Sequence, residues 1–174
     1  METLELEKVK IETPRQIRIS PNLGLGEHKR KEIADSLKKV LADSYCLLVM
    51  TQNYHWNVRG INFKVIHELT ENQYLDIFKA IDDIAERIRT LGEDAPGTMT
   101  EFNELTSINL PNKELSDREM IVDLLESNET IVKTLRNALH PASEVNDEAT
   151  ADLVTERLKV HEKVAWMWRG HLEQ

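Results

Sequence analysis

Residues 63–91 carry the pattern that most constrains the fold. Apolar side chains, with one threonine and one tyrosine among them, recur there at near-heptad spacing: Phe63, Ile66, Thr70, Tyr74, Ile77, Ile81, Ile84, Ile88 and Leu91. This spacing predicts one continuous helix, closed by Gly92. At about 1.5 Å per residue the helix is roughly 43 Å long. A helix of that length needs packing partners along its whole length, so the chain has to supply other long helices.

A second long helix is predicted directly before it, over residues 27–58. Its apolar stripe recurs mostly at three- and four-residue steps: Ile33, Leu37, Val40, Leu41, Leu47, Leu48 and Thr51. Gly60 follows where a helix ends in a left-handed residue, and Asn62 is placed to cap the next helix. The two helices are therefore expected to form an antiparallel hairpin with a tight turn.

The second half of the chain predicts two more long helices after a long connection. Residues 93–115 contain prolines and a glycine, and we expect them to form a crossover with a short helix over 99–105. The run from Ser116 to Glu119 is a capping-box pattern that starts the third long helix, and His140-Pro141 is expected to end it. The fourth long helix is expected over 147–171. Its predicted stripe includes His161 and Trp168, which we expect, with Trp166, to be core or interface residues rather than ligands.

This pattern predicts an all-α, ferritin-like four-helix bundle with a long crossover between its second and third long helices. Residues 27–174 form the expected domain, and residues 1–26, which contain prolines and glycines and no apolar period, form an expected flexible tail.

Composition narrows the class of protein. The net charge of −9 does not imply non-specific binding of nucleic acid by the whole chain. The single Cys46 suits a reducing compartment, and no apolar run reaches about 18 residues, so we expect a cytoplasmic protein that does not enter the membrane. The tail leaves two alternatives open: a surface-lying extension, or a DNA-contacting arm that uses its basic residues, Lys8, Lys10, Arg15 and Arg18. DNA binding would place the protein at the nucleoid.

A set of metal-ligand side chains lies on and beside the 63–91 helix. His67, Glu71, Asp82 and Glu86 lie on the helix, and His55 precedes it at the same distance from the turn centre as His67 follows it. The hairpin should therefore bring the two histidines side by side. Asp82 lies fifteen residues beyond His67, roughly 22 Å along the axis, so one ion cannot bind all of these groups within one chain.

The direction and spacing of the ligands predict a second subunit. The four helix residues span an arc of roughly 100° that is turned away from the apolar stripe. His67 and Glu86 are equidistant from the midpoint between Asp76 and Ile77, and so are Glu71 and Asp82. Two such helices packed antiparallel about a two-fold axis would give two identical sites. Each would take His55, His67 and Glu71 from one subunit and Asp82 and Glu86 from the other.

The chemistry of this mixed nitrogen and oxygen set suits Fe(II), with Zn, Mn or Co as competitors. The alternative is that these carboxylates are ordinary solvated helix residues and the histidines polar partners. No histidine in the chain follows a glutamate by three residues, which argues against a di-iron site inside the bundle built on Glu-x-x-His motifs.

Three stretches resemble the Dps family, the ferritin-like proteins of starved bacterial cells. They are HWNVRGINFKVIHELTENQY, DDIAERIRTLG and the later DEATADLVTERLKVHEKVAWMWR. The resemblance implies a shell of twelve subunits that oxidises Fe(II), preferably with hydrogen peroxide, at inter-subunit sites, holding two irons each, and stores Fe(III) inside. It assigns the ferroxidase ligands to His55, His67, Asp82 and Glu86, with Glu71 where the family often has Asp.

The resemblance also bears on residues outside the ligand set. Trp56 matches the aromatic residue beside the site, where it would quench a stray oxidising equivalent or simply pack. An acidic set opens the last predicted helix: Glu144, Asp147, Glu148 and Asp152. These residues either provide favourable charge at a helix N-terminus or line an ion-entry pore that attracts Fe(II).

Three functions remain open at this point. The first is a peroxide-dependent ferroxidase that stores iron and protects DNA and the cell from oxidative damage. The second is a DNA-condensing nucleoid protein whose metal site is structural or occupied by zinc. The third is a plain helical oligomer without metal.

Overall fold

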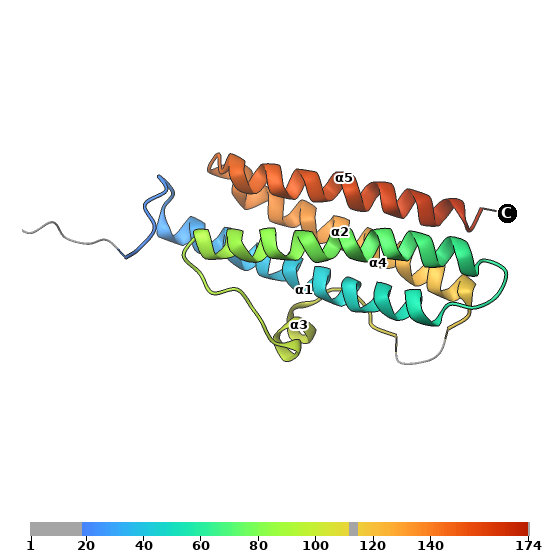
Figure 1. The fold of residues 1–174 in the computed structure, drawn as a ribbon. Helices are drawn as coiled ribbons and strands as arrows, with labels where there is room; N and C mark the ends of the chain where they lie inside the picture. Colours follow the sequence, from blue (N-terminus) through green and yellow to red (C-terminus); the bar gives the residue numbers. More distant parts are fainter. Residues whose placement is uncertain (1–18, 112–114, 174) are drawn as a thin grey trace, which may run out of the picture.

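The computed structural model describes residues 19–111 and 115–173, and the described chain contains five helices and no strand. Four are long: α1 (Glu27–Asn57), α2 (Phe63–Thr90), α4 (Asp117–Glu144) and α5 (Glu148–Gly170). They form an elongated bundle, with the short α3 (Met99–Leu105) beside α1 on the crossover between α2 and α4 (Figure 1). The all-helical fold class predicted from the sequence is confirmed.

Local sequence signals place most helix ends. Gly60 and Gly92 take positive φ angles of 98° and 97° in the turns that follow α1 and α2, a conformation that glycine adopts at little cost. Ser116 and Glu119 form the predicted capping box at the start of α4. Asn62 precedes α2 as predicted, but its side chain does not cap the helix. It donates instead to Oδ2 of Asp117, which ties the α1–α2 turn to the start of α4.

The predicted end of the third long helix at His140-Pro141 is wrong, because α4 continues through Pro141 to Glu144. Proline lacks its own N–H and so removes one backbone hydrogen bond, and its ring crowds the carbonyl four residues before it. The loss falls in the last turn, where Pro141 and Ala142 are buried against the bundle. Packing of the apolar face therefore outweighs the local preference at this position.

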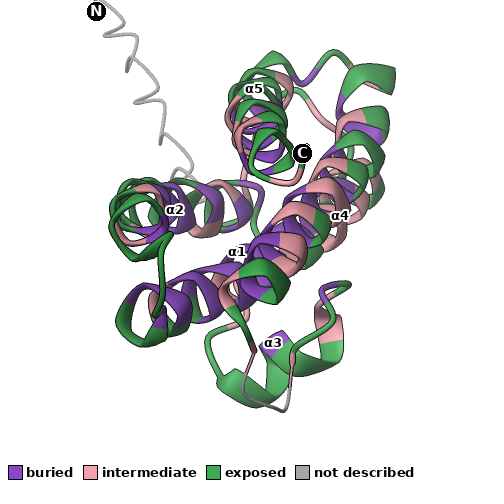
Figure 2. Cartoon of the chain, turned by 90° about the vertical axis from the view of Figure 1, so that its right-hand side faces the viewer, coloured by how far each residue is buried: buried purple, intermediate pink, exposed green. Residues whose placement is uncertain are grey.

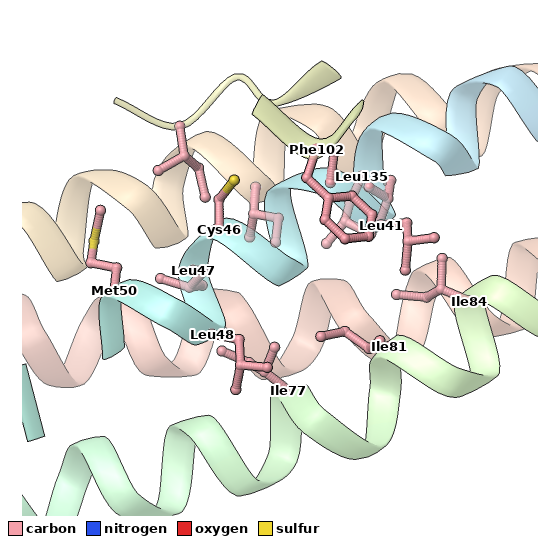
Figure 3. Close-up of a cluster of buried hydrophobic side chains, with 14 of the residues drawn as sticks. Leu41, Cys46, Leu47, Leu48, Met50, Ile77, Ile81, Ile84, Phe102 and Leu135 are labelled. Carbon is pink, nitrogen blue, oxygen red and sulfur yellow. The ribbon is translucent and has the colours of Figure 1, made fainter. Parts of the chain in front are cut away.

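The core runs along α1, which supplies more buried residues than any other described helix. Figure 2 shows that α2, by contrast, leaves a broad exposed face on the outside of the bundle. Its buried stripe meets α1 in the cluster of Leu48, Ile77 and Ile81, while Phe102 of α3 lies over the other side of α1 (Figure 3). The face of α2 that carries the predicted ligands is therefore not the face that packs.

A fully buried carboxylate anchors the crossover. Asp43 of α1 accepts hydrogen bonds from Oγ1 of Thr106 at 2.8 Å, the amide of Ser107 at 2.6 Å and Oγ1 of Thr134 at 2.7 Å. Its donors come from the crossover and from α4, and together they satisfy a side chain that would be costly to bury alone.

The predicted tail is only partly described. Residues 1–18 lie outside the described residues, and residues 19–26 lead into α1 without forming a helix. Arg30 of α1 donates to the carbonyls of Leu25 and Leu91, which fixes this lead-in against the C-terminal end of α2. No described helix is long and apolar enough to cross a membrane.

Candidate metal centre

The α1–α2 hairpin brings His55 and His67 into contact, as their spacing about the turn predicts. Their rings stack with centroids 3.7 Å apart and planes inclined by only 17°. His55 lies in the last turn of α1 and is 8% exposed, whereas His67 lies in the second turn of α2 and is half-buried.

Each histidine is oriented by the backbone of the other. Nδ1 of His55 lies 2.9 Å from the carbonyl oxygen of His67, and Nδ1 of His67 lies 2.9 Å from the carbonyl oxygen of His55. A carbonyl only accepts, so both Nδ1 atoms donate, which leaves Nε2 of each ring as the nitrogen available to a metal. No hydrogen bond within the described chain uses either Nε2, and neither atom is buried. Metal-binding histidines are typically held in this way.

The three carboxylates predicted to complete the site are on the exposed face of α2. Glu71, Asp82 and Glu86 are all exposed, and none of them forms an ion pair within the described chain. No three metal-ligand side chains come together among the described residues of a single chain. The structure thus brings His55 and His67 together and leaves Asp82 and Glu86 farther along α2.

Two large apolar side chains lie between these ligands on the same face of α2. Leu75 is 56% exposed and Phe78 is 68% exposed. They are equidistant from the midpoint between Asp76 and Ile77, as the ligands are. Neither residue was among the predicted site residues, although each lies four residues from a predicted ligand, Leu75 from Glu71 and Phe78 from Asp82, and so shares its helix face.

Aromatic rings surround the histidine pair. Phe63 stacks on His67 with ring centroids 5.2 Å apart, and Tyr74 meets His55 edge-on at the same separation. The inclusion of Phe63 in the packed stripe of its helix is wrong, because this ring is 46% exposed and lies on an imidazole instead. Trp56, next to His55 in sequence, is exposed at the end of α1.

The acidic set at the start of α5 divides into two kinds of residue. Glu144, Glu148 and Asp152 are exposed, with Glu144 paired to Lys29 at 2.8 Å. Asp147 is buried, caps α5 through the amide of Thr150, and holds the Arg87 guanidinium at 2.6 Å. Burial alone would raise the pKa of Asp147, but hydrogen bonds from Thr150 and Arg87 outweigh it and hold the pKa below its usual range.

A third buried histidine has a different environment. His161 of α5 donates from Nδ1 to Oδ1 of Asn128, while its Nε2 faces the Arg157 guanidinium at 3.3 Å. Burial, and then the charge of Arg157, lower its pKa to about 3, so it is neutral at neutral pH. Gln73 of α2 joins this network by donating to Asn128 and accepting from Trp168. His161 and Trp168 are core residues, as predicted, whereas Trp166 is exposed.

The chain matches known proteins over nearly all of this structure. The model of the ferritin-like domain family matches residues 34–174. A DNA protection during starvation protein of Bacillus anthracis is 33% identical over 144 residues, which cover 83% of this chain and 99% of that protein. DpsC from Streptomyces coelicolor superposes with a TM-score of 0.84 at 30% identity, over 94% of this chain and 97% of the other.

A third similarity concerns a solved structure whose protein class is stated. The Dps protein from Vibrio cholerae superposes with a TM-score of 0.83 at 26% identity, over 91% of this chain and all of the other. It is described as a member of a broad superfamily of ferritin-like diiron-carboxylate proteins. The fold, the family model and the relatives agree, and the chain belongs to the Dps family of ferritin-like proteins.

Proposed function

We propose that this protein is a mini-ferritin that oxidises Fe(II), preferably with hydrogen peroxide, and stores the Fe(III) product. The observation that carries the proposal is the His55–His67 pair, with both Nδ1–H groups bound to carbonyls and both Nε2 atoms left to accept a metal. The Vibrio cholerae relative belongs to a diiron-carboxylate superfamily, which fits iron as the metal.

The site takes ligands from two subunits. His55, His67 and Glu71 of one subunit meet Asp82 and Glu86 of the other when two α2 helices pack antiparallel about a two-fold axis. Leu75 and Phe78 support this pairing, because two exposed apolar side chains on the ligand face are costly until another surface covers them. Each dimer then has two identical sites.

Each site binds two Fe(II) ions as substrates. The stacked imidazoles are 3.7 Å apart, which is close to the separation of about 3.5–4 Å between the ions of two-metal sites. The in-plane lone pairs of two nearly parallel rings do not converge on one point, so one imidazole serves each ion. Zn, Mn and Co compete for the same donors.

The chemistry requires two ions close together. Two Fe(II) ions give one electron each to hydrogen peroxide, and the O–O bond breaks to leave two hydroxide ions and two Fe(III) ions. A single Fe(II) would supply one electron and release hydroxyl radical. The paired site thus removes both reactants of that damaging reaction, and so protects DNA and the rest of the cytoplasm.

Storage requires an enclosed space, and we propose a shell of twelve subunits built from these dimers. The exposed Glu144, Glu148 and Asp152 are the best candidates for an entry pore, because their negative charge attracts Fe(II). Asp147 supports the pore from within the fold, through its ion pair with Arg87.

Mixing two inactive variants tests the shared site directly. One variant carries His55→Ala and His67→Ala, and the other carries Asp82→Ala and Glu86→Ala. Each alone should lose rapid peroxide-dependent Fe(II) oxidation. Refolded together in equal amounts, they should recover about a quarter of the wild-type sites, because half of the dimers are mixed and each has one complete site. No recovery in confirmed mixed dimers would show that the ligands do not combine across subunits.

Metal and oxidant are tested on the wild-type protein. Stopped-flow oxidation of Fe(II) should be faster with hydrogen peroxide than with oxygen, and the particle mass should correspond to twelve chains. A single bound zinc ion with no oxidation would favour the alternative of a structural metal site.

DNA binding through the N-terminal tail remains a separate proposal, and its basic residues lie outside the described part of the chain. The name of the Bacillus anthracis relative refers to DNA protection, which oxidation chemistry alone would also provide. A gel-shift series across salt concentrations, comparing the full chain with a deletion of residues 1–20, separates the two routes.

A further inference from the structure

The histidine pair is part of a larger cluster of rings. Phe63 stacks on His67 with ring centroids 5.2 Å apart and planes inclined by 23°, and His55 stacks on the same imidazole at 3.7 Å. Tyr74 sets its ring edge-on to His55, at an interplanar angle of 74°. Three of the four rings come from α2 and one from α1.

Phe63 has no evident packing role in the bundle. It is the first residue of α2 and nearly half of its side chain is exposed, a position at which a polar residue would cost less. It lies one helical turn before His67, which is the spacing that places one side chain over the next along a helix. Its ring contact with His67 is the interaction that accounts for an aromatic residue there.

His67 depends on this contact for its orientation. The ring is half-buried, and its one hydrogen bond in the described chain runs from Nδ1 to the carbonyl of His55. A single bond leaves the ring able to tilt about that direction. The stacked contacts with Phe63 and His55 restrict this movement, so Nε2 keeps one direction before metal binds.

Tyr74 acts on the other imidazole. His55 is bonded through Nδ1 to the carbonyl of His67 and lies 3.3 Å from Oγ1 of Thr70, so it is held on the edge that carries Nδ1. Tyr74, one turn beyond Thr70 on α2, limits movement of the ring face. Its own side chain is half-buried.

We propose that Phe63 and Tyr74 are positioning residues of the metal centre, which keep the two imidazoles stacked so that the site retains two ions instead of one. This inference rests on the proposed two-ion function. Neither ring donates to the metal. Both act by fixing the direction of a ligand nitrogen, as outer partners of metal ligands do.

The test removes each ring and then restores it, in the full assembled protein. The variants are Phe63→Leu and Tyr74→Leu, which lose the ring, and Phe63→Tyr and Tyr74→Phe, which keep it. Trp166→Leu is the control, because it removes an exposed aromatic side chain of α5 that makes no ring contact with either site histidine. Titration with Co(II), followed by visible absorption and calorimetry, counts the bound ions and reports their coordination.

The expected result is a second Co(II) ion bound about tenfold or more weakly in Phe63→Leu, with a changed absorption spectrum and a thermal midpoint close to wild type. Tyr74→Leu should show a smaller loss, while the ring-keeping variants and Trp166→Leu should match the wild type. If Phe63→Leu bound the second Co(II) ion as tightly as the wild type does, the inference would be overturned and the proposed function would stand. A wild-type protein that binds no Co(II) and no Fe(II) would overturn the proposed function itself.

Discussion

Two histidine environments in this molecule show how the same side chain becomes a ligand or a structural residue. His161 is buried with both ring nitrogens engaged, one by Asn128 and one by the Arg157 guanidinium. His55 and His67 are each engaged at Nδ1 only. Burial alone does not separate them, because His55 is also buried. The difference lies in the second ring nitrogen, which is engaged in His161 and unused in His55 and His67.

The first test of this difference removes the two site histidines together. In His55→Ala/His67→Ala, the rate of peroxide-dependent Fe(II) oxidation should fall at least about a thousandfold, since losing one outer partner of a metal ligand already costs roughly 10- to 100-fold. Stopped-flow absorbance measures the rate. The free energy of unfolding should fall by about 2 kcal/mol, because two hydrogen bonds are lost. A rate near that of the wild type would remove the histidines from the mechanism.

The converse substitution is His161→Ala, which should affect stability and not chemistry. It leaves a cavity in the core and removes a donor to Asn128, so the free energy of unfolding should fall by about 3 kcal/mol. Urea unfolding followed by circular dichroism measures it. Oxidation per folded subunit should equal the wild-type value; a selective loss of oxidation would mean that the buried network serves the site.

The acidic residues before and within α5 offer a similar contrast, between a buried, paired carboxylate and exposed ones. Asp147→Asn keeps a capping side chain but breaks the ion pair with Arg87. The free energy of unfolding should fall by about 2 kcal/mol, which is less than the loss expected when a fully buried ion pair is broken. Glu148→Gln with Asp152→Asn should change stability little and slow iron uptake instead. Iron loading followed over time, beside urea unfolding, measures both. Unchanged uptake in the double variant would argue against the pore.

The last prediction concerns the pH dependence of stability. His161 has a folded pKa of about 3, below its unfolded value near 6.5, so between these values the unfolded chain binds a proton that the folded chain does not. Stability should therefore be full above pH 6.5 and fall as the pH drops, with His161 contributing about 1 kcal/mol per pH unit. Urea unfolding at pH 7, 6, 5 and 4 measures the slope. His161→Gln should flatten it; an equal slope in both proteins would contradict the assignment.

The sequence predicted the helices well where local chemistry decides their ends. Glycines with positive φ and capping boxes act within a few residues. The helix ends at Gly60, Gly92 and Ser116 could therefore be predicted from the local sequence. The predicted helix end at Pro141 was wrong because burial against other helices overrides the local preference. The sequence of one segment does not reveal that burial. The prediction that Phe63 packs in the core was wrong. Its spacing fits the apolar stripe, but it is the first residue of α2 and lies outside the core.

The candidate site was predictable for a similar reason. Residues placed symmetrically about a hairpin turn must meet, and this fixed the pairing of His55 with His67. The reciprocal bonds from each Nδ1 to the opposite carbonyl were not predictable, because they depend on the rotation of two rings about their side-chain bonds. The partner subunit's share of the site remains a prediction.

The buried Asp43 limits where this chain can be cut or shortened. Its three donors lie 63, 64 and 91 residues further along the chain, so the carboxylate is satisfied only when the crossover and α4 are both in place. A redesigned link between α2 and α4 that lacked Thr106 and Ser107 would leave the buried acid with one of its three donors, Thr134. The crossover is thus a required part of the core, and loop engineering in this scaffold should leave Thr106 and Ser107 in place.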